Sequence, residues 1–471
     1  MSRLIPLTTG LALTALMPTP AIAESDPELV ALVQAQAETI RRLEARLAVV
    51  EGALGARAST EVDPGHAAVA PPAAAPRPAS GPAQPVEQTA VSALDWSGGA
   101  PVFGFGDLRF KPRGRILTDA SSTWGSRHDD RNIAGTEMRA ARLGFEGQAG
   151  DQLTYVVEAD FSDNTVGVRS ANIELSRRLR GLDASLTLGQ RLNDRGMDGS
   201  TGLVSLPFVE RNAVGAAIAP QRGSFGLGVT GRLAGPGWHA SLSLTGEDLS
   251  GVGDNDDILT WMTRAHWNPL RSDAATVHLG GWAFHETFPE DTASISRSLY
   301  VAGHFNDQVR VTTGALAAPS HGVGLGLEAG LFGEHGWVYA EAGERTVSGI
   351  SSATGDIDQN AWSVAAGLFL TGERPGYAAR TGTLARPKIE HPVLDGGAGA
   401  WEIAGRYDAY DFTDFDQGGE ASAVTLGLNW YWSNQLRFML DTTFWRIDNR
   451  SGAFSGADDG VTVLGRSQFT F

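Results

Sequence analysis

From residue 113 onward the chain is a succession of short runs in which apolar and polar residues alternate. In the last run, residues 460–471, Val and Phe alternate with Thr, Arg and Gln, and only Leu464 breaks the order. A period of two is the pattern of a strand with one apolar and one polar face. We count about sixteen to eighteen such runs, a spacing that suits tilted membrane strands joined by turns and loops.

A soluble sandwich and a membrane barrel both produce this alternation, and they differ in what covers the apolar face. A sandwich of this size needs a second apolar layer, which the sequence does not supply. A closed barrel turns its apolar face to lipid and pairs every backbone amide with a neighbouring strand. After residue 23 no apolar run approaches the ~20 residues of a spanning helix. We therefore predict an all-β fold, a transmembrane antiparallel β-barrel of about 16 strands over residues 105–471.

Three further segments precede the predicted barrel. Residues 1–23 combine Arg3, an apolar run and a small-x-small sequence, which predicts a cleaved signal peptide. Residues 24–55 predict a helix, because apolar residues recur seven apart at the a and d positions of a coiled coil. The helix is either an oligomerisation stalk in the periplasm or a solitary amphipathic helix, and the heptads favour the stalk. Residues 56–104, rich in Ala and Pro, predict a flexible linker.

Composition narrows the possible functions. The net charge of -17 argues against a nucleic-acid binder. Cysteine is absent, which excludes disulfides and thiolate metal sites. The histidines show no ligand spacing, so we expect no metal and no cofactor. Ser, His and Asp occur on polar faces, but no spacing singles out a triad, and we predict no catalytic residues and no enzyme.

Seven short motifs follow one another along the predicted barrel. They are RGRILTDA at 113–120, RAARLGFEG at 139–147, GQ at 189–190 with TGL at 201–203 and LPFVERN at 206–212, LTGER at 370–374, GAWEIAGRY at 399–407, GLNWY at 427–431 and RFML at 437–440. Together they resemble the phosphate-selective porin O and P family over about residues 105–471. The resemblance implies a sixteen-stranded trimeric channel in the outer membrane of a Gram-negative bacterium, often preceded by a coiled coil.

The resemblance also implies a function. We expect a water-filled channel for passive diffusion of small solutes, favouring anions such as phosphate or other oxyanions, with outer-membrane lipid and two further copies of the chain as partners. One departure from the family bears on phosphate, since Lys111 and Lys388 are the only lysines among 37 Lys and Arg residues. A general or cation-preferring porin, a barrel enzyme and a structural tether of the envelope remain as alternatives.

Arginines on the polar faces are the candidate pore residues. A guanidinium stays charged and offers a planar fork to oxyanions, and rings of arginine form anion filters. The segment 190–222 sits where trimeric porins fold a loop inward, and its arginines predict weak anion preference. Alternatively each arginine pairs with a carboxylate such as Asp119, Glu146, Glu158 or Glu402 and only packs the wall. The predicted pore-lining residues are Arg115, Arg142, Arg191, Arg195, Arg211, Arg406 and Arg437.

Overall fold

The structure, a computed structural model, describes residues 92–95, 100–162, 164–247, 249, 256–349 and 355–471. The predicted signal peptide, the predicted coiled-coil helix and most of the predicted linker lie outside these residues. The chain divides into two compact units, 1–86 and 87–471, and all of the described residues lie in the second.

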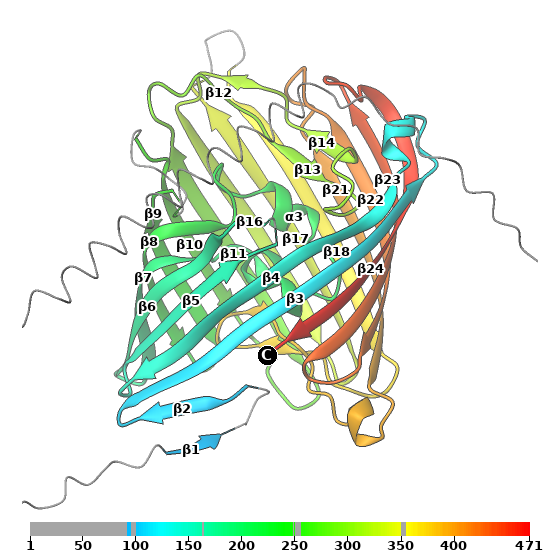
Figure 1. Cartoon of the computed structure of the whole chain (residues 1–471). Coiled ribbons are helices and arrows are strands. Elements are labelled where there is room, and N and C mark those ends of the chain that lie inside the picture. The colour runs from blue at the N-terminus through cyan, green and yellow to red at the C-terminus, as the bar shows by residue number, and fades with distance from the viewer. Residues whose placement is uncertain (1–91, 96–99, 163, 248, 250–255, 350–354) are drawn as a thin grey trace, which may run out of the picture. The chain divides into compact units, whose positions relative to one another are not determined.

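Sixteen antiparallel strands close into a barrel, which confirms the barrel part of the predicted fold class (Figure 1). Each strand pairs with the next one along the chain, and β24 (Gly456–Thr470) returns to pair with β3 (Leu108–Trp124). The remaining barrel strands are β4 (Ala134–Ala149), β5 (Leu153–Asp160), β6 (Gly167–Leu179), β7 (Leu182–Leu192), β8 (Phe225–Gly235), β9 (Trp238–Thr245), β10 (Leu259–Trp267), β11 (Thr276–Thr287), β16 (His321–Phe332), β17 (Gly336–Ser348), β18 (Ile357–Phe369), β21 (Ala400–Asp411), β22 (Glu420–Tyr431) and β23 (Leu436–Asn449).

Two short strands extend the sheet beyond the barrel. β1 (Ser92–Asp95) pairs with β2 (Val102–Phe105), which pairs with the first residues of β3. β1 and most of β2 therefore fall within residues 56–104, for which the sequence predicted a linker.

Among the described residues no helix is long and apolar enough to span a bilayer. The shorter elements are η1 (Asp129–Arg131), α2 (Met197–Ser200), η2 (Leu203–Ser205), α3 (Ala213–Ala217), β12 (Ser294–Ile295), β13 (Ser298–Tyr300), β14 (Arg310–Thr312), β15 (Leu316–Ala317), β19 (Tyr377–Ala378), β20 (Thr383–Leu384) and η3 (Val393–Asp395).

The two faces of the wall follow the alternation in the sequence. Apolar side chains such as Ile116, Leu327 and Phe469 are exposed on the outside, whereas charged ones such as Glu328 are buried inside the barrel. Leu464, which broke the order in the last strand, points inward because it packs against Val209 and Met439 within the lumen. The exception thus marks a place where the barrel interior is apolar.

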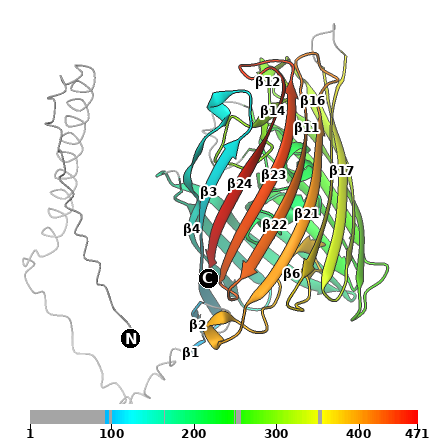
Figure 2. The same cartoon turned by 90° about the vertical axis from the view of Figure 1, so that its right-hand side faces the viewer.

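Three long connections fill much of the interior. We call residues 193–224 the constriction loop, 288–320 the cap loop and 370–399 the long turn. The C-terminus and the long turn lie at one end of the barrel, the turn rim, and the cap loop enters from the opposite end, the loop rim (Figures 1 and 2). Figure 1 shows α3 of the constriction loop inside the ring of strands.

The barrel closes at the turn rim through the last residue of the chain. Gly114 N donates to Phe471 O at 3.0 Å, and Phe471 N donates to Gly114 O at 3.1 Å. The Phe471 ring covers Gly114, where an added Cβ would lie 2.4 Å from the ring and 2.9 Å from the backbone oxygen of Arg142. The ring could turn away from a Cβ, but the backbone oxygen is fixed by its strand. Gly114 is therefore required for this closure.

We expect Gly114→Ala to destabilise the barrel by roughly 1–3 kcal/mol, the usual cost of overpacking. Gly405→Ala is the matched control, because a Cβ there meets only a side-chain atom of Leu426 at 3.9 Å. The temperature at which the folded band converts to the unfolded band on gels measures the effect. Equal unfolding temperatures for the two variants would show that the closure tolerates a methyl group.

Candidate pore constriction

The constriction loop is held across the lumen by carboxylates of the wall. Glu341 of β17 accepts a hydrogen bond from Met197 N at 2.6 Å and another from the Asn212 side chain at 2.5 Å. Asp408 of β21 accepts from Ala213 N at 2.8 Å, at the start of α3. These backbone amides have no partner within the loop, and a buried unpaired amide costs stability. The inward carboxylates thus fix the path of the loop.

Arginines of β21, β23 and β24, on the same side of the barrel, hold the carbonyl groups of the same loop. Arg437 donates to Leu206 O, and Arg466 donates to Val209 O, each at 2.7 Å. Three further bonds have the same character: Arg406 to Glu210 O at 2.8 Å, Gln468 to Val204 O at 2.9 Å and Asn429 to Pro207 O at 2.8 Å.

Two arginines outside the strands, the buried Arg195 and the half-buried Arg297, clamp the end of α3. Arg195 donates to Gly215 O at 2.6 Å and Arg297 of the cap loop donates to Ala217 O at 2.5 Å and Pro220 O at 2.7 Å. Carbonyl groups at a helix C-terminus carry partial negative charge that a cation stabilises. Burial lowers the pKa of Arg195 to about 10 and that of Arg297 to about 9, and both remain charged at neutral pH.

Glu210 joins the tip of the constriction loop to the wall near β3. It accepts from Arg139 of β4 at 2.9 Å and from Arg466 of β24 at 3.3 Å. Burial alone would raise the pKa of Glu210, but Arg139 and Arg466 outweigh it and lower the pKa to about 2. Glu210 is therefore ionised at neutral pH and this contact is an ion pair.

One sector of the lumen is packed with apolar side chains. α3 belongs to one buried apolar cluster together with Trp282 and Phe284 of β11 and with Val309 and Val311 of the cap loop. Well-packed apolar side chains leave few voids large enough for water. A water path therefore has to run elsewhere, along the wall that this cluster does not cover.

The long turn enters the lumen from the turn rim and docks on β10 and β11. Arg264 donates to Thr381 O at 2.8 Å and to Gly382 O at 2.6 Å, and His266 donates to Ala379 O at 3.0 Å. Three histidines in a row continue this surface: His266 stacks on His278, and the His239 ring is tilted against His266. The Tyr377 hydroxyl lies 2.7 Å from His278 Nδ1.

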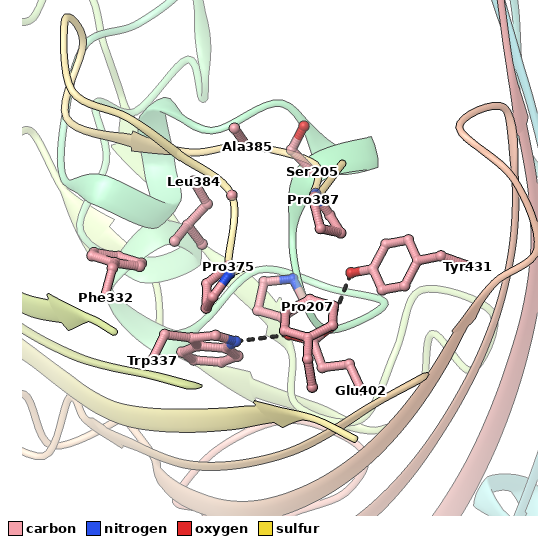
Figure 3. A pocket seen from close by; sticks show the side chains of 12 residues that line it. Ser205, Pro207, Phe332, Trp337, Pro375, Leu384, Ala385, Pro387, Glu402 and Tyr431 are labelled. Carbon is pink, nitrogen blue, oxygen red and sulfur yellow. Dashed lines mark hydrogen bonds between the residues drawn. The ribbon is translucent and has the colours of Figure 1, made fainter. Parts of the chain in front are cut away.

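The long turn also contacts the constriction loop. Leu384 N donates to the Thr201 hydroxyl at 3.0 Å. Figure 3 shows the junction, where Glu402 accepts from Trp337 at 2.7 Å and from Tyr431 at 2.9 Å. Only about 20 Å³ of cavity remains there, close to the volume that one water needs. The junction is therefore a packed contact between the turn and the loop.

Charged side chains on β3 to β6 remain partly exposed to the lumen. Lys111 and Arg113 of β3 are 28% and 30% exposed, and Arg169 of β6 is 41% exposed. Arg115 and Arg142, at 12% and 13%, lie between them. We call this surface the basic wall. Its carboxylates are Glu146, Glu158 and Asp160, and they link the cations in a continuous chain of ion pairs.

The predicted pore residues divide into two groups. Arg115 and Arg142 lie side by side on the basic wall, in register across β3 and β4. Arg195, Arg211, Arg406 and Arg437 bind backbone carbonyls of the constriction loop, and Arg191 lies on β7 near Asp194 and Glu174. The structure therefore brings two of the seven together on the basic wall, where both pair with Glu158, and joins four others to carbonyls of the loop, while Arg191 belongs to neither group.

The sequence prediction did not select several residues that the structure brings to the lumen. Arg113 is one of the arginines that the alternation places on a polar strand face, and Lys111 shares the same inward parity, so the alternation could have found it as well. Arg169 lies at an irregularity in the pairing of β5 with β6. Counting alternate residues along β6 therefore does not predict which face of the sheet its side chain occupies. The alternation places Arg264 on the polar face of its strand, but its contact with the long turn gave no signal, because it joins segments far apart in sequence. Among the described residues no group of three or more His, Asp and Glu is arranged to hold a metal ion.

Comparisons with known proteins agree with the barrel. Residues 110–471 match the model of the family described as phosphate-selective porin O and P. A Caulobacter vibrioides protein described only as uncharacterized is 29% identical over 459 residues, covering 90% of this chain and 87% of that protein. OmpT, an outer membrane protein of Vibrio cholerae, superposes with a TM-score of 0.50 at 11% identity over 79% of this chain and 99% of OmpT. An anion-selective porin from Comamonas acidovorans gives a TM-score of 0.46 at 12% identity, over 77% of this chain and 100% of that porin.

Removing the tip of the long turn should widen the path through the barrel. Gly376 and Ala385 are already joined by a hydrogen bond of 3.1 Å, so deleting residues 377–384 leaves ends that meet without strain. We expect a larger single-channel conductance in planar bilayers. Arg374→Ala in the same turn is the control, because Arg374 bonds outward to Ser272 O. If the deletion leaves the conductance of the native channel unchanged, the long turn does not restrict the path.

Proposed function

Because the chain belongs to the phosphate-selective porin O and P family, we propose that it forms a passive outer-membrane channel with a weak preference for small anions, oxyanions included. The family and the closed barrel indicate an outer-membrane channel of a Gram-negative bacterium. The proposed anion preference is supported by the basic wall. The basic wall is the partly exposed charged surface along β3 to β6 that neither the apolar cluster nor the long turn covers.

The charges of the basic wall favour anions. Its cations are Lys111, Arg113, Arg115, Arg142 and Arg169, and its carboxylates are Glu146, Glu158 and Asp160, which leaves an excess of two positive charges. Charges farther away than a Debye length of ~8 Å are largely screened at physiological salt. The net charge of -17 on the whole chain therefore does not set the field that an ion meets beside this wall.

The chemistry of the wall suits oxyanions but does not favour tight phosphate binding. Guanidinium groups bind carboxylate and phosphate through paired N–H donors. The arginines of the wall already use some of these donors in ion pairs with neighbouring carboxylates. Lys111 is the one residue of the basic wall that supplies an ammonium group. Weak, repeated contacts let an ion enter and leave, which conduction requires.

The barrel also suggests an orientation. In outer-membrane barrels the short turns face the periplasm and the longer loops face outward. We therefore propose that the turn rim, with Phe471 and the long turn, faces the periplasm. The N-terminal segment would then emerge on the same side, since β3 begins at the turn rim.

The selectivity can be tested by replacing Arg113, Arg115 and Arg142 together with Gln. We expect the reversal potential under a KCl gradient to move toward cation preference, because the remaining wall carries more carboxylates than cations. Arg177→Gln is the matched control, since Arg177 is an exposed arginine of β6 outside the ion-pair chain of the wall. A native channel that already prefers cations, together with an unchanged reversal potential in the triple variant, would contradict the proposal.

We also propose that three copies assemble side by side through the barrel wall. The outward positions of β3, β24 and β4 around Ala120 are small, with Gly465 opposite Ala120 on one side and Thr136 on the other. Small residues let two backbones approach closely in lipid. The heptads of residues 24–55 support the same assembly, as a stalk that joins the copies in the periplasm.

Deleting residues 24–90 should leave conducting trimers that dissociate at a lower temperature, because the wall contact remains and the stalk is lost.

Ala120→Trp in the full chain should instead yield folded monomers, and Leu327→Trp on the far wall is its control, since Leu327 is 72% exposed. Sedimentation in detergent measures the assembly. Monomers from the deletion and trimers from Ala120→Trp would place the contact in the stalk.

A further inference from the structure

Glu158 of β5 is the carboxylate with the most arginine partners on the basic wall. Its oxygens lie 3.2 Å from Arg113 Nε, 2.9 Å from an Arg115 nitrogen and 3.4 Å from an Arg142 nitrogen. The carboxylate is only 3% exposed, whereas Arg113 is 30% exposed. Arg113 thus faces the lumen, Arg115 and Arg142 reach it with only 12% and 13% of their side chains exposed, and Glu158 lies behind all three.

A missing side chain allows this arrangement. Gly144 of β4 stands in register between Arg113 of β3 and Glu158 of β5. Because Gly144 has no side chain, the arginines of β3 reach across β4 to a carboxylate two strands away. A Cβ at Gly144 would lie 2.1 Å from the backbone oxygen of Val157, so a larger residue does not fit there. The convergence of three arginines on Glu158 is therefore built into the packing of the strands.

We propose that Glu158 is a resident counterion that occupies the oxyanion position of the Arg113, Arg115 and Arg142 cluster and thereby limits how tightly the channel binds a passing oxyanion. This inference rests on the proposed anion preference and names the residue that weakens it. A carboxylate and a phosphate present similar pairs of oxygens to guanidinium donors. While Glu158 holds the inner donors, a solute meets only the outer ones.

A purely structural role makes a different prediction. The register places Arg115 directly opposite Arg142, and like charges at that position destabilise a sheet. Glu158 reduces this repulsion whether or not anions bind. If that were its whole role, removing its charge would lower the stability of the barrel without changing its response to oxyanions. The two roles are therefore separated by measuring oxyanion binding and stability in the same variant.

The test compares Glu158→Gln with the native channel in planar bilayers, using inorganic phosphate added to KCl as the probe. We expect stronger anion preference and a phosphate-dependent block of the chloride current, with half-block at a phosphate concentration about tenfold lower than in the native channel. Glu158→Asp keeps the charge and should behave like the native channel. Glu158→Met, an uncharged side chain of similar length, replaces the Gln variant if that variant does not fold.

Glu174→Gln is the matched control for the removal of one negative charge. Glu174 lies on the neighbouring strand β6 and accepts hydrogen bonds from Ser176 and Thr187. Its ion pair with Arg232 is long, at 3.7 Å, and Arg191 lies farther away. It should show a smaller change in selectivity and no phosphate block. Equal phosphate block in Glu158→Gln and Glu174→Gln, or no more block in Glu158→Gln than in the native channel, would overturn the inference.

The failure of this inference is distinguishable from a failure of the proposed function. If the native chain conducts, and the triple arginine variant shifts its selectivity, but Glu158→Gln gains no phosphate block, then only the role of Glu158 is wrong. If the native channel prefers cations and the arginine variant changes nothing, the anion preference itself is wrong. A lower unfolding temperature of Glu158→Gln with native phosphate sensitivity would assign Glu158 the structural role.

Discussion

The hydrogen bonds from inward side chains of the wall to the backbone of the constriction loop determine the interior of this barrel. The loop contains only short helical segments, so most of its N–H and C=O groups need partners from elsewhere. Glu341 and Asp408 accept from its amides, and Arg437 and Arg466 donate to its carbonyls. Each contact also neutralises or pairs a group that would be costly to bury alone. The polar face of the wall therefore acts first as a scaffold for the loop.

This scaffold decides where water and ions can pass. Once α3 is fixed, it packs with Trp282, Phe284 and the cap loop and closes one sector of the lumen. The long turn docks on Arg264 and closes in from the turn rim. The basic wall on β3 to β6 keeps its partial exposure. The proposed selectivity therefore depends on a few side chains on one side of the lumen, because charges farther away than a Debye length of ~8 Å are largely screened.

The sequence predicted the fold well because strand geometry is local. Successive side chains of a strand point to opposite faces, so the alternation gave the barrel and the inward orientation of Arg115, Arg142, Arg406 and Arg437. The partner of each arginine is not local information. Arg437 faces a carbonyl of the constriction loop and Arg115 faces Glu158, although both occupy the same kind of position in their strands. Parity also fails at irregular pairings, as it does before Arg169.

The basic wall must satisfy two demands that oppose each other. An anion-preferring surface needs cations close together, but adjacent cations such as Arg115 and Arg142 repel one another across the sheet. A carboxylate placed behind them relieves the repulsion, and it also uses the donors that would hold a solute. Conduction tolerates this loss, because an ion that binds too tightly does not leave. Paired arginines therefore give the wall both a stable packing and a weak positive field, whereas unpaired arginines would give tighter binding at the expense of stability and of ion flow.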